Sequence, residues 1–320
     1  MLDPNQCAAF ADEVTRFSGE GKGKPAERSV VIARGNDELF ADEDADLAID
    51  VMSCTKSFTV TAAGLLVDAG KCMLDTKAAD YLDFLRDDYA GVTIRHLLTM
   101  TSGYNAVGGT YGQQVDGNWT DGSTTFDQPA APLFEPGTMW HYHDDAIRTL
   151  GLLLNTIAGE NIDDLYRREV GDVIGLDFNW GSYHGGPIQP DSGSGVICSA
   201  RDVVKHCRLW LNRGKHDDRQ LLSEAFVEQA TSLQTKGIPP YEGPFFRGLD
   251  GASRFGFMWR TNAGGDLPAL PRDAFWISGW NHNRLFVAPS LDLIVTRTGI
   301  DGYVGDDLAK WNTAFETLLA

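Results

Sequence analysis

The sequence predicts an α+β fold, in which an antiparallel sheet is flanked by helices and a mostly helical region is inserted into it. Strand-like segments lie near the start of the chain and again in its last third, with helical periodicity between them. Distant strands can share one sheet, and helices near the two ends of the chain can then cover one of its faces. We expect the functional site in the cleft between the sheet and the helical region.

The composition argues against some classes of binding partner. The chain has 320 residues, with 45 Asp plus Glu against 27 Lys plus Arg and a formal charge of −18. This length suits two domains or one large unit with a substantial core. An acidic chain repels phosphate backbones and anionic surfaces, and no apolar run reaches the ~20 residues of a membrane span. We therefore expect neither nucleic acid nor a membrane as a partner.

Cysteine usage and the N-terminus favour a reducing compartment. The five cysteines are odd in number and contain no C-x-x-C pair, so neither a disulfide framework nor a zinc cluster is expected. Residues 1–7 lack the basic and apolar regions of a signal peptide. We expect a cytoplasmic protein without a metal or an organic cofactor.

The first third of the chain predicts a helix, a strand pair and a group of helices. Asp3 and Pro4 form a typical helix start, because Asp caps the first turn and Pro fits within it. Residues 28–34 have strand composition, and Gly35-Asn36 supplies a turn to a second strand. The helices expected next lie at 53–70, 75–82 and 93–100.

The rest of the chain predicts a long loop, further helices, a strand cluster and a final helix. Residues 102–132 lose periodicity over more than the usual ~12–15 residues, and their glycines and aromatics favour a binding loop. The expected helices are 147–159, 162–170, 199–214 and 306–319, and the expected strands 255–261, 274–278, 284–288 and 293–298. Residues 1–75 and 190–320 would form the sheet region and 76–189 the helical region with long loops, together one catalytic unit.

The most informative local pattern is Ser53-Cys54-Thr55-Lys56. Three helical residues turn the chain by about 300°, so Ser53 and Lys56 share one face. A serine hydroxyl becomes a nucleophile only with a base in reach, and the first turn of a helix directs free N–H groups at a developing alkoxide. The same residues also fit a plain helix N-cap at Ser53, since such short motifs arise by chance.

Further motifs follow Ser53 in a fixed order. They are TIRHLLTMTSG at 93–103, FEPGTMWHY at 134–142, and WISG at 276–279 leading into RLFVAPSLDLIV at 284–295. No G-x-S-x-G elbow of an α/β-hydrolase occurs. From Arg28 to the C-terminus the chain resembles the serine β-lactamase and penicillin-binding-protein-like superfamily, and most of all its class C-like branch of esterases, D-aminopeptidases and linear-amide hydrolases. The resemblance implies the β-lactamase/transpeptidase-like fold.

The resemblance also implies an active site. Ser53 matches the acylated nucleophile, Lys56 its activating lysine, and Tyr142 the tyrosine that exchanges protons with the nucleophile and the leaving group. Either Lys56 or Tyr142 would be the base in the ground state, and Tyr142 is also compatible with a half-buried core aromatic. The backbone N–H groups of Ser53 and Trp280 would form the oxyanion hole. The residues expected to contact substrate are Asp144, Ile277, Ser278, Gly279, Tyr104 and Trp140.

Two positions depart from the family pattern. The Tyr-x-Asn element reads Tyr142-His143-Asp144, and an ionised carboxylate donates no hydrogen bond. Asp144 would hold Lys56 as an ammonium or cap a helix starting at Asp145. The third motif has Ile277 where Lys or His is usual, which offers no charge to a carboxylate-bearing β-lactam or peptide. Arg284 would either supply that charge or face solvent.

Other residues have competing interpretations. His141, His143 and Asp145 fit H-x-H-x-D, the start of a metallo-hydrolase signature, but Ala146 follows in place of His and the required later ligands are not identifiable. We expect His141 and His143 to face solvent or start a helix, and His96 and His206 to pack or hydrogen-bond. The remaining residues considered are Cys54, expected to be small and buried, the possible later ligands His184, His216 and His282, and the flanking aromatics Tyr111, Trp119, Trp276 and Trp280.

Together these observations predict a serine hydrolase that forms an acyl-enzyme on Ser53. The preferred activity is that of a carboxylesterase on small esters, and the expected partner is a small-molecule ester or amide substrate. A linear-amide hydrolase and a β-lactamase or D-aminopeptidase are the alternatives within the superfamily. A non-catalytic ligand-binding or sensor domain of the same fold is the alternative of another class.

Overall fold

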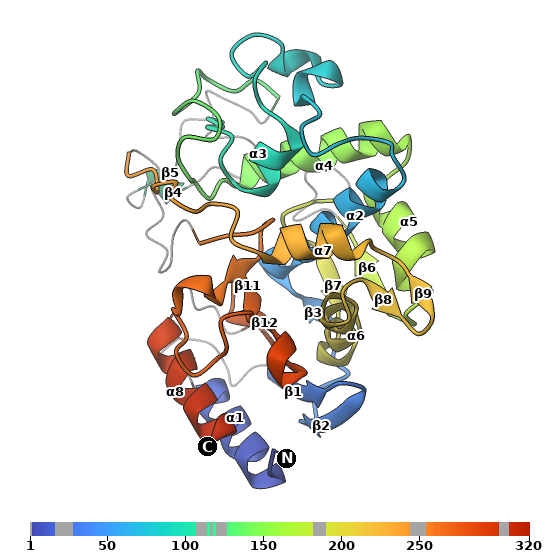
Figure 1. Cartoon of the computed structure of the whole chain (residues 1–320), viewed down its shortest axis with the longest axis vertical. Coiled ribbons are helices and arrows are strands. Elements are labelled where there is room, and N and C mark those ends of the chain that lie inside the picture. Colours follow the sequence, from blue (N-terminus) through green and yellow to red (C-terminus); the bar gives the residue numbers. More distant parts are fainter. Residues whose placement is uncertain are drawn as a thin grey trace.

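The computed structural model describes residues 2–16, 28–106, 114–115, 118–119, 127–181, 190–243, 254–300 and 307–320. Its largest element is a six-stranded sheet with the strand order β10-β11-β12-β13-β1-β2 (Figure 1). Every neighbouring pair in this sheet is antiparallel, and the predicted α+β class is confirmed. The strands are β1 (Arg28–Arg34), β2 (Asp37–Ala41), β10 (Arg260–Thr261), β11 (Phe275–Gly279), β12 (Asn283–Ala288) and β13 (Leu293–Gly299).

The pairing of β1 with β13 joins the two strand-rich parts of the sequence. Ile32 lies opposite Val295 in the register. Successive side chains of a strand point to opposite faces, and the five central residues of β1 are all buried. Ile32 belongs to one hydrophobic core cluster and its neighbour Val31 to the other. Both faces of the sheet are therefore covered.

The two terminal helices cover one face. Helices α1 (Pro4–Arg16) and α8 (Leu308–Leu319) lie side by side at the end of the molecule that holds both termini (Figure 1). The ring of Trp311 lies 6.3 Å from that of Phe10 and 4.9 Å from that of Phe286 on β12, measured between centroids. These large aromatic side chains account for much of the apolar area buried there.

The opposite face packs against α6 (Ala200–Leu211), and α2 (Thr55–Asp68), α4 (Asp144–Ala158) and α5 (Ile162–Tyr166) extend the same core. Phe58 of α2 stacks on His206 of α6 with their ring centroids 4.0 Å apart. The ring of Tyr166 on α5 lies 5.2 Å from that of Phe58. One core cluster therefore contains residues from both the predicted sheet region and the predicted helical region.

The remaining elements are short. A three-stranded sheet has the order β3-β7-β6, and two hairpins pair β4 with β5 and β8 with β9. These strands are β3 (Ile49–Asp50), β4 (Gln114–Val115), β5 (Asn118–Trp119), β6 (Phe178–Trp180), β7 (Val196–Cys198), β8 (Lys215–His216) and β9 (Arg219–Gln220). The further helices and helical turns are η1 (Met52–Cys54), η2 (Ala78–Asp80), η3 (Asp83–Leu85), α3 (Ile94–Leu98), the π-helical η4 (Arg167–Gly171), α7 (Glu224–Thr231), η6 (Asn262–Gly264) and η7 (Pro289–Leu291).

The structure confirms a predicted helix start and corrects two predicted segments. The predicted cap at Ser199 is confirmed, since its side chain accepts a hydrogen bond from the N–H of Asp202. The predicted helix at 75–82 is wrong, because only η2 forms there. The predicted strand at 255–261 shrinks to β10, because Met258 has a left-handed φ of 59° and Gly256 packs against the Ala230 carbonyl. The left-handed residue interrupts an extended strand.

All five cysteines are buried and unpaired, as the odd count suggested. Burial of Cys54 raises the pKa of its thiol to about 12, so this neighbour of Ser53 stays a protonated, packed side chain. Within the described ranges, no helix combines the length and the apolar character needed to cross a membrane.

Candidate active site

Ser53 lies on a strained turn that leads from β3 into α2. The N–H of Met52 donates to Oδ1 of Asp50 at 2.7 Å, and the N–H of Val51 donates to the Val196 carbonyl. Met52 has φ of 53°, a left-handed conformation that is costly for a residue other than glycine. The two hydrogen bonds hold this strained turn in place, and the turn sets Ser53 at the start of the helix.

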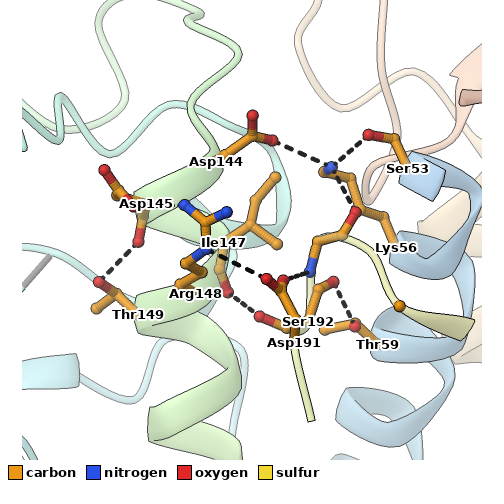
Figure 2. A network of polar contacts seen from close by, with 12 residues as sticks. Ser53, Lys56, Thr59, Asp144, Asp145, Ile147, Arg148, Thr149, Asp191 and Ser192 are labelled. Atoms are coloured by element: carbon orange, nitrogen blue, oxygen red, sulfur yellow. Dashed lines mark hydrogen bonds and ion pairs between the residues drawn. The ribbon is translucent and has the colours of Figure 1, made fainter. Parts of the chain in front are cut away.

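Lys56 lies one turn further along, and its side chain is 1% exposed. Its Nζ lies 2.8 Å from Oγ of Ser53, 3.2 Å from Oδ1 of Asp144 and 2.9 Å from the carbonyl oxygen of Gly193 (Figure 2). An ammonium group has three N–H donors. The site therefore offers one acceptor for each of them.

Tyr142 reaches the same hydroxyl from the segment that precedes α4. Its phenol donates to Oγ of Ser53 at 2.8 Å, and Nζ of Lys56 lies 4.9 Å from the centroid of its ring. Ser53 and Tyr142 are 89 positions apart in sequence. The structure thus brings together the hydroxyl, the amine and the phenol that the sequence singled out.

The surroundings of Lys56 decide its charge. Burial opposes the charged form, but the neighbouring Tyr142 and Asp144 outweigh this and raise the pKa of Lys56 above its usual range. Lys56 is therefore an ammonium ion at neutral pH. This favours its role as a fixed cation beside Ser53.

Asp144 pairs with Lys56, and the capping interpretation is wrong. Helix α4 begins at Asp144 itself, and the N-cap residue is His143, whose side chain makes no capping hydrogen bond. With the helix starting one residue earlier than expected, the Asp144 carboxylate extends from the first turn toward Nζ of Lys56. The carboxylate thus stands where the resemblance led us to expect an asparagine amide.

The two expected oxyanion donors lie on adjoining segments. A Cβ at Gly279 would come within 2.5 Å of the Val51 carbonyl and 3.2 Å of the Cys54 nitrogen, so only glycine allows β11 to approach the Ser53 turn this closely. Among the residues that the structure describes, the N–H groups of Ser53 and Trp280 donate to no protein acceptor. The indole of Trp280 is 52% exposed beside them.

Several predicted substrate contacts are wrong. Tyr104 and Trp140 are each only 1% exposed, with Tyr104 against Tyr89 and Trp140 stacked on Phe255. A side chain this deeply buried presents no surface to a ligand.

The third motif also differs from expectation. Ile277 is buried in the core, while Ser278 beside it is half-buried. Arg284 neither faces solvent nor reaches toward substrate: it is buried, and Nη1 donates to the carbonyls of Gly279 and Asn283 at 3.1 and 2.8 Å. Strand β11, beside Ser53, therefore presents the Ser278 side chain and backbone groups to a substrate.

Sequence reasoning missed a buried network behind Lys56 (Figure 2). Nη1 of Arg148 lies 2.6 Å from Oδ1 of Asp145, and Nε lies 3.4 Å from Oδ2 of Asp191. Oδ1 of Asp191 accepts from the N–H of Gly193 at 2.8 Å, and the carbonyl of Gly193 accepts from Lys56. The i,i+3 spacing of Asp145 and Arg148 is the one signal that the sequence offers, because Asp191 lies in a Gly- and Ser-rich segment.

The histidines do not support a metal site. His141 and His143 are buried, so neither faces solvent, whereas the alternative expectation of a helix start holds for His143, the N-cap residue of α4. In the described part of the chain, no three His, Cys, Asp or Glu side chains cluster so as to hold a metal ion. His206 hydrogen-bonds with Tyr166 and Ser57, and His96 with the Thr93 N–H, as expected. His184, Tyr111 and the side chain of Trp119 lie outside the described residues.

Comparisons with known proteins give one family match and several proteins of similar fold. The model of the family described as Beta-lactamase matches residues 29–303. An uncharacterised protein of Alkalihalophilus pseudofirmus is 24% identical over 280 residues, covering 79% of this chain and 73% of that protein. Two solved structures resemble the fold along its length. EstCE1, described as a hydrolase with promiscuous acyltransferase activity, has a TM-score of 0.72 at 19% identity and 99% coverage of both chains. A penicillin-binding protein homologue of Caulobacter crescentus has a TM-score of 0.71 at 18% identity, also with 99% coverage of both.

Proposed function

The chain belongs to the Beta-lactamase family, and from this premise we propose that it is a serine hydrolase acting on small carboxylic esters through an acyl-enzyme on Ser53. Membership confirms the resemblance that the S-x-x-K and later motifs indicated. The observation that carries the proposal is the convergence on one hydroxyl, because Nζ of Lys56 and Oη of Tyr142 each lie 2.8 Å from Oγ of Ser53.

In the proposed acylation, Oγ of Ser53 attacks the ester carbonyl carbon and the hydroxyl proton moves to the oxygen of Tyr142. Nζ of Lys56 already donates to three acceptors and is held as an ammonium ion. Lys56 is therefore better suited to stabilise a negative charge beside it than to accept a proton. We therefore assign the proton transfer to Tyr142, which accepts this proton once its own phenol proton has passed to solvent, with the ammonium of Lys56 beside it. The same phenol returns the proton to the departing alkoxide, which leaves as an alcohol.

The tetrahedral intermediate carries a negative oxygen that needs donors. The backbone N–H groups of Ser53 and Trp280 supply them, at the point where Gly279 lets the two segments meet. Water then attacks the acyl carbon and passes a proton to Tyr142, and Ser53 leaves with that proton. The carboxylic acid is released, and no cofactor takes part in this scheme.

The surroundings of the third motif favour an ester without a carboxylate. Ile277 carries no charge, and Arg284 is directed at backbone carbonyls. Neither supplies a cation to the carboxylate of a β-lactam or a peptide. The exposed indole of Trp280, next to the proposed oxyanion donor, suits an apolar acyl or alcohol group.

The direct test is a substrate panel of p-nitrophenyl acetate and butyrate, longer esters, linear amides and nitrocefin. We expect turnover of the short esters, slow turnover of nitrocefin, and loss of both in Ser53→Ala. Ser290→Ala, which removes an exposed serine far along the chain, is the matched control. Equal hydrolysis by wild type and Ser53→Ala would place the nucleophile elsewhere, and nitrocefin turnover as fast as ester turnover would refute the specificity argument.

The same panel separates an enzyme from a binding domain. A ligand-binding or sensor domain of this fold would show stoichiometric acylation of Ser53 without turnover. Preference for the linear amides over the esters would assign the chain to the amide hydrolases of the family instead.

A further inference from the structure

The turn that carries Trp280 is unusual in its backbone. It joins β11 to β12, and its residues Asn281 and His282 have φ of 61° and 58°. Two successive non-glycine residues in the left-handed region are strained, and such a turn persists only where its surroundings hold it.

Buried side chains hold every carbonyl of this turn. Nη1 of Arg284 donates to the carbonyls of residues 279 and 283, and Nη1 of Arg297 to those of residues 281 and 282, at 2.8–3.1 Å. Nδ2 of Asn283 donates to the Trp280 carbonyl at 2.7 Å. Five successive carbonyl groups thus each accept from a side chain, and an ordinary chain reversal needs no such support.

The two arginines occupy positions that are costly to fill with charge. Arg284 and Arg297 lie directly opposite each other on β12 and β13, and both are buried. Like charges at directly paired positions of a sheet destabilise it, and an arginine cannot shed its proton. Both side chains nevertheless point toward the turn. This indicates that the conformation of the turn serves a purpose beyond joining two strands.

One peptide group connects this arrangement to catalysis. The carbonyl of the Gly279–Trp280 peptide accepts from Nη1 of Arg284 at 3.1 Å, and the N–H of the same peptide is the proposed oxyanion donor. A cation at the carbonyl draws electron density through the amide, which makes the N–H a stronger donor. The same hydrogen bond fixes the plane of the peptide, so its N–H keeps one direction.

We propose that Arg284 is a positioning residue of the oxyanion hole, which aims and polarises the Trp280 N–H through the Gly279 carbonyl. This inference rests on the proposed function. Arg297 holds the carbonyls of Asn281 and His282, so it fixes the turn without contacting the donor peptide.

The test compares Arg284→Gln and Arg284→Met with wild type. Glutamine keeps an N–H donor but removes the charge, whereas methionine removes both. Loss of a whole oxyanion donor lowers kcat by about 100- to 1,000-fold. We therefore expect a fall in kcat of about tenfold for Gln and about a hundredfold for Met, with KM within about twofold of wild type.

The decisive readout is the Ki of a trifluoromethyl ketone with the acyl group of the ester. Its adduct with Ser53 places a negative oxygen in the hole, so Ki should rise in step with the fall in kcat/KM. Arg34→Gln is the matched control, because Nε of Arg34 also donates to a backbone carbonyl, that of Leu291, at 3.1 Å elsewhere in the sheet. We expect wild-type kcat and Ki in this control.

Folding is checked by thermal unfolding, and Arg284→Lys, which keeps a cation, replaces any variant that does not fold. A folded Arg284 variant with wild-type kcat, or with lowered kcat and unchanged Ki, would overturn the inference. Failure of the proposed function is distinct, because wild type would then neither turn over esters nor form the ketone adduct.

Discussion

Protonation of His206 should destabilise the folded protein from within its core. His206 of α6 is fully buried against α2, and desolvation lowers its pKa to about 3. Its Nδ1 lies 2.8 Å from the hydroxyl of Tyr166, and Nε2 lies 3.1 Å from Oγ of Ser57, which itself donates to the Cys54 carbonyl. This network suits a neutral imidazole protonated at Nε2, with Tyr166 as the donor to Nδ1.

The magnitude follows from proton linkage. The unfolded chain binds a proton at this histidine below pH 6.5, whereas the folded chain does not until about pH 3. Stability from neutral His206 is thus present above pH 6.5 and lost as the pH falls toward 3, at about 1.4 kcal/mol per pH unit. Between pH 6.5 and 5.0 the free energy of unfolding should fall by about 2 kcal/mol through this group alone.

The assay is urea unfolding followed by circular dichroism at several pH values. His206→Gln keeps an amide donor and acceptor but does not titrate, so its free energy of unfolding should depend less steeply on pH. The control His216→Gln removes a half-exposed imidazole from β8 and reports the effect of losing a histidine outside the core. Equal pH slopes for wild type and His206→Gln would refute the reasoning.

Three further outcomes follow from the site. Tyr142→Phe should lower kcat by at least about a hundredfold without lowering Tm, while the control Tyr81→Phe, on the surface, keeps wild-type kcat. Asp144→Asn removes one cause of the raised pKa of Lys56, so the alkaline limb of the kcat/KM profile should move to lower pH; an unmoved limb would contradict the ion pair. Arg148→Met leaves two buried carboxylates without their cation and should cost about 3–5 kcal/mol of stability, which urea unfolding would measure; a loss under 1 kcal/mol would contradict this.

The sequence predicted those parts of the site that depend on local geometry. Ser53 and Lys56 share a helix face because of their spacing, and hydrophobic runs of strand composition predicted β1 and β13 closely. Tyr142 could be placed beside them only through the order of motifs, because 89 positions separate it from Ser53.

The parts of the site that the sequence did not predict depend on the direction in which side chains point. Position in a strand does not tell which face Arg284 occupies, so its place under the turn could not be predicted. Tyr104 directly follows one of the quoted motifs and Trp140 lies within another, yet both pack into the core. Asp191 joins Arg148 across 43 positions of chain, and no local pattern signals such a contact.

The most direct measurement is covalent trapping of the nucleophile by a fluorophosphonate, read by intact mass and peptide mapping. One adduct per chain, located on Ser53 and absent from Ser53→Ala, is the expected result, with slower labelling in Tyr142→Phe. Labelling of another residue, or no adduct in a preparation that hydrolyses esters, would contradict the assignment of Ser53 as the acylated residue.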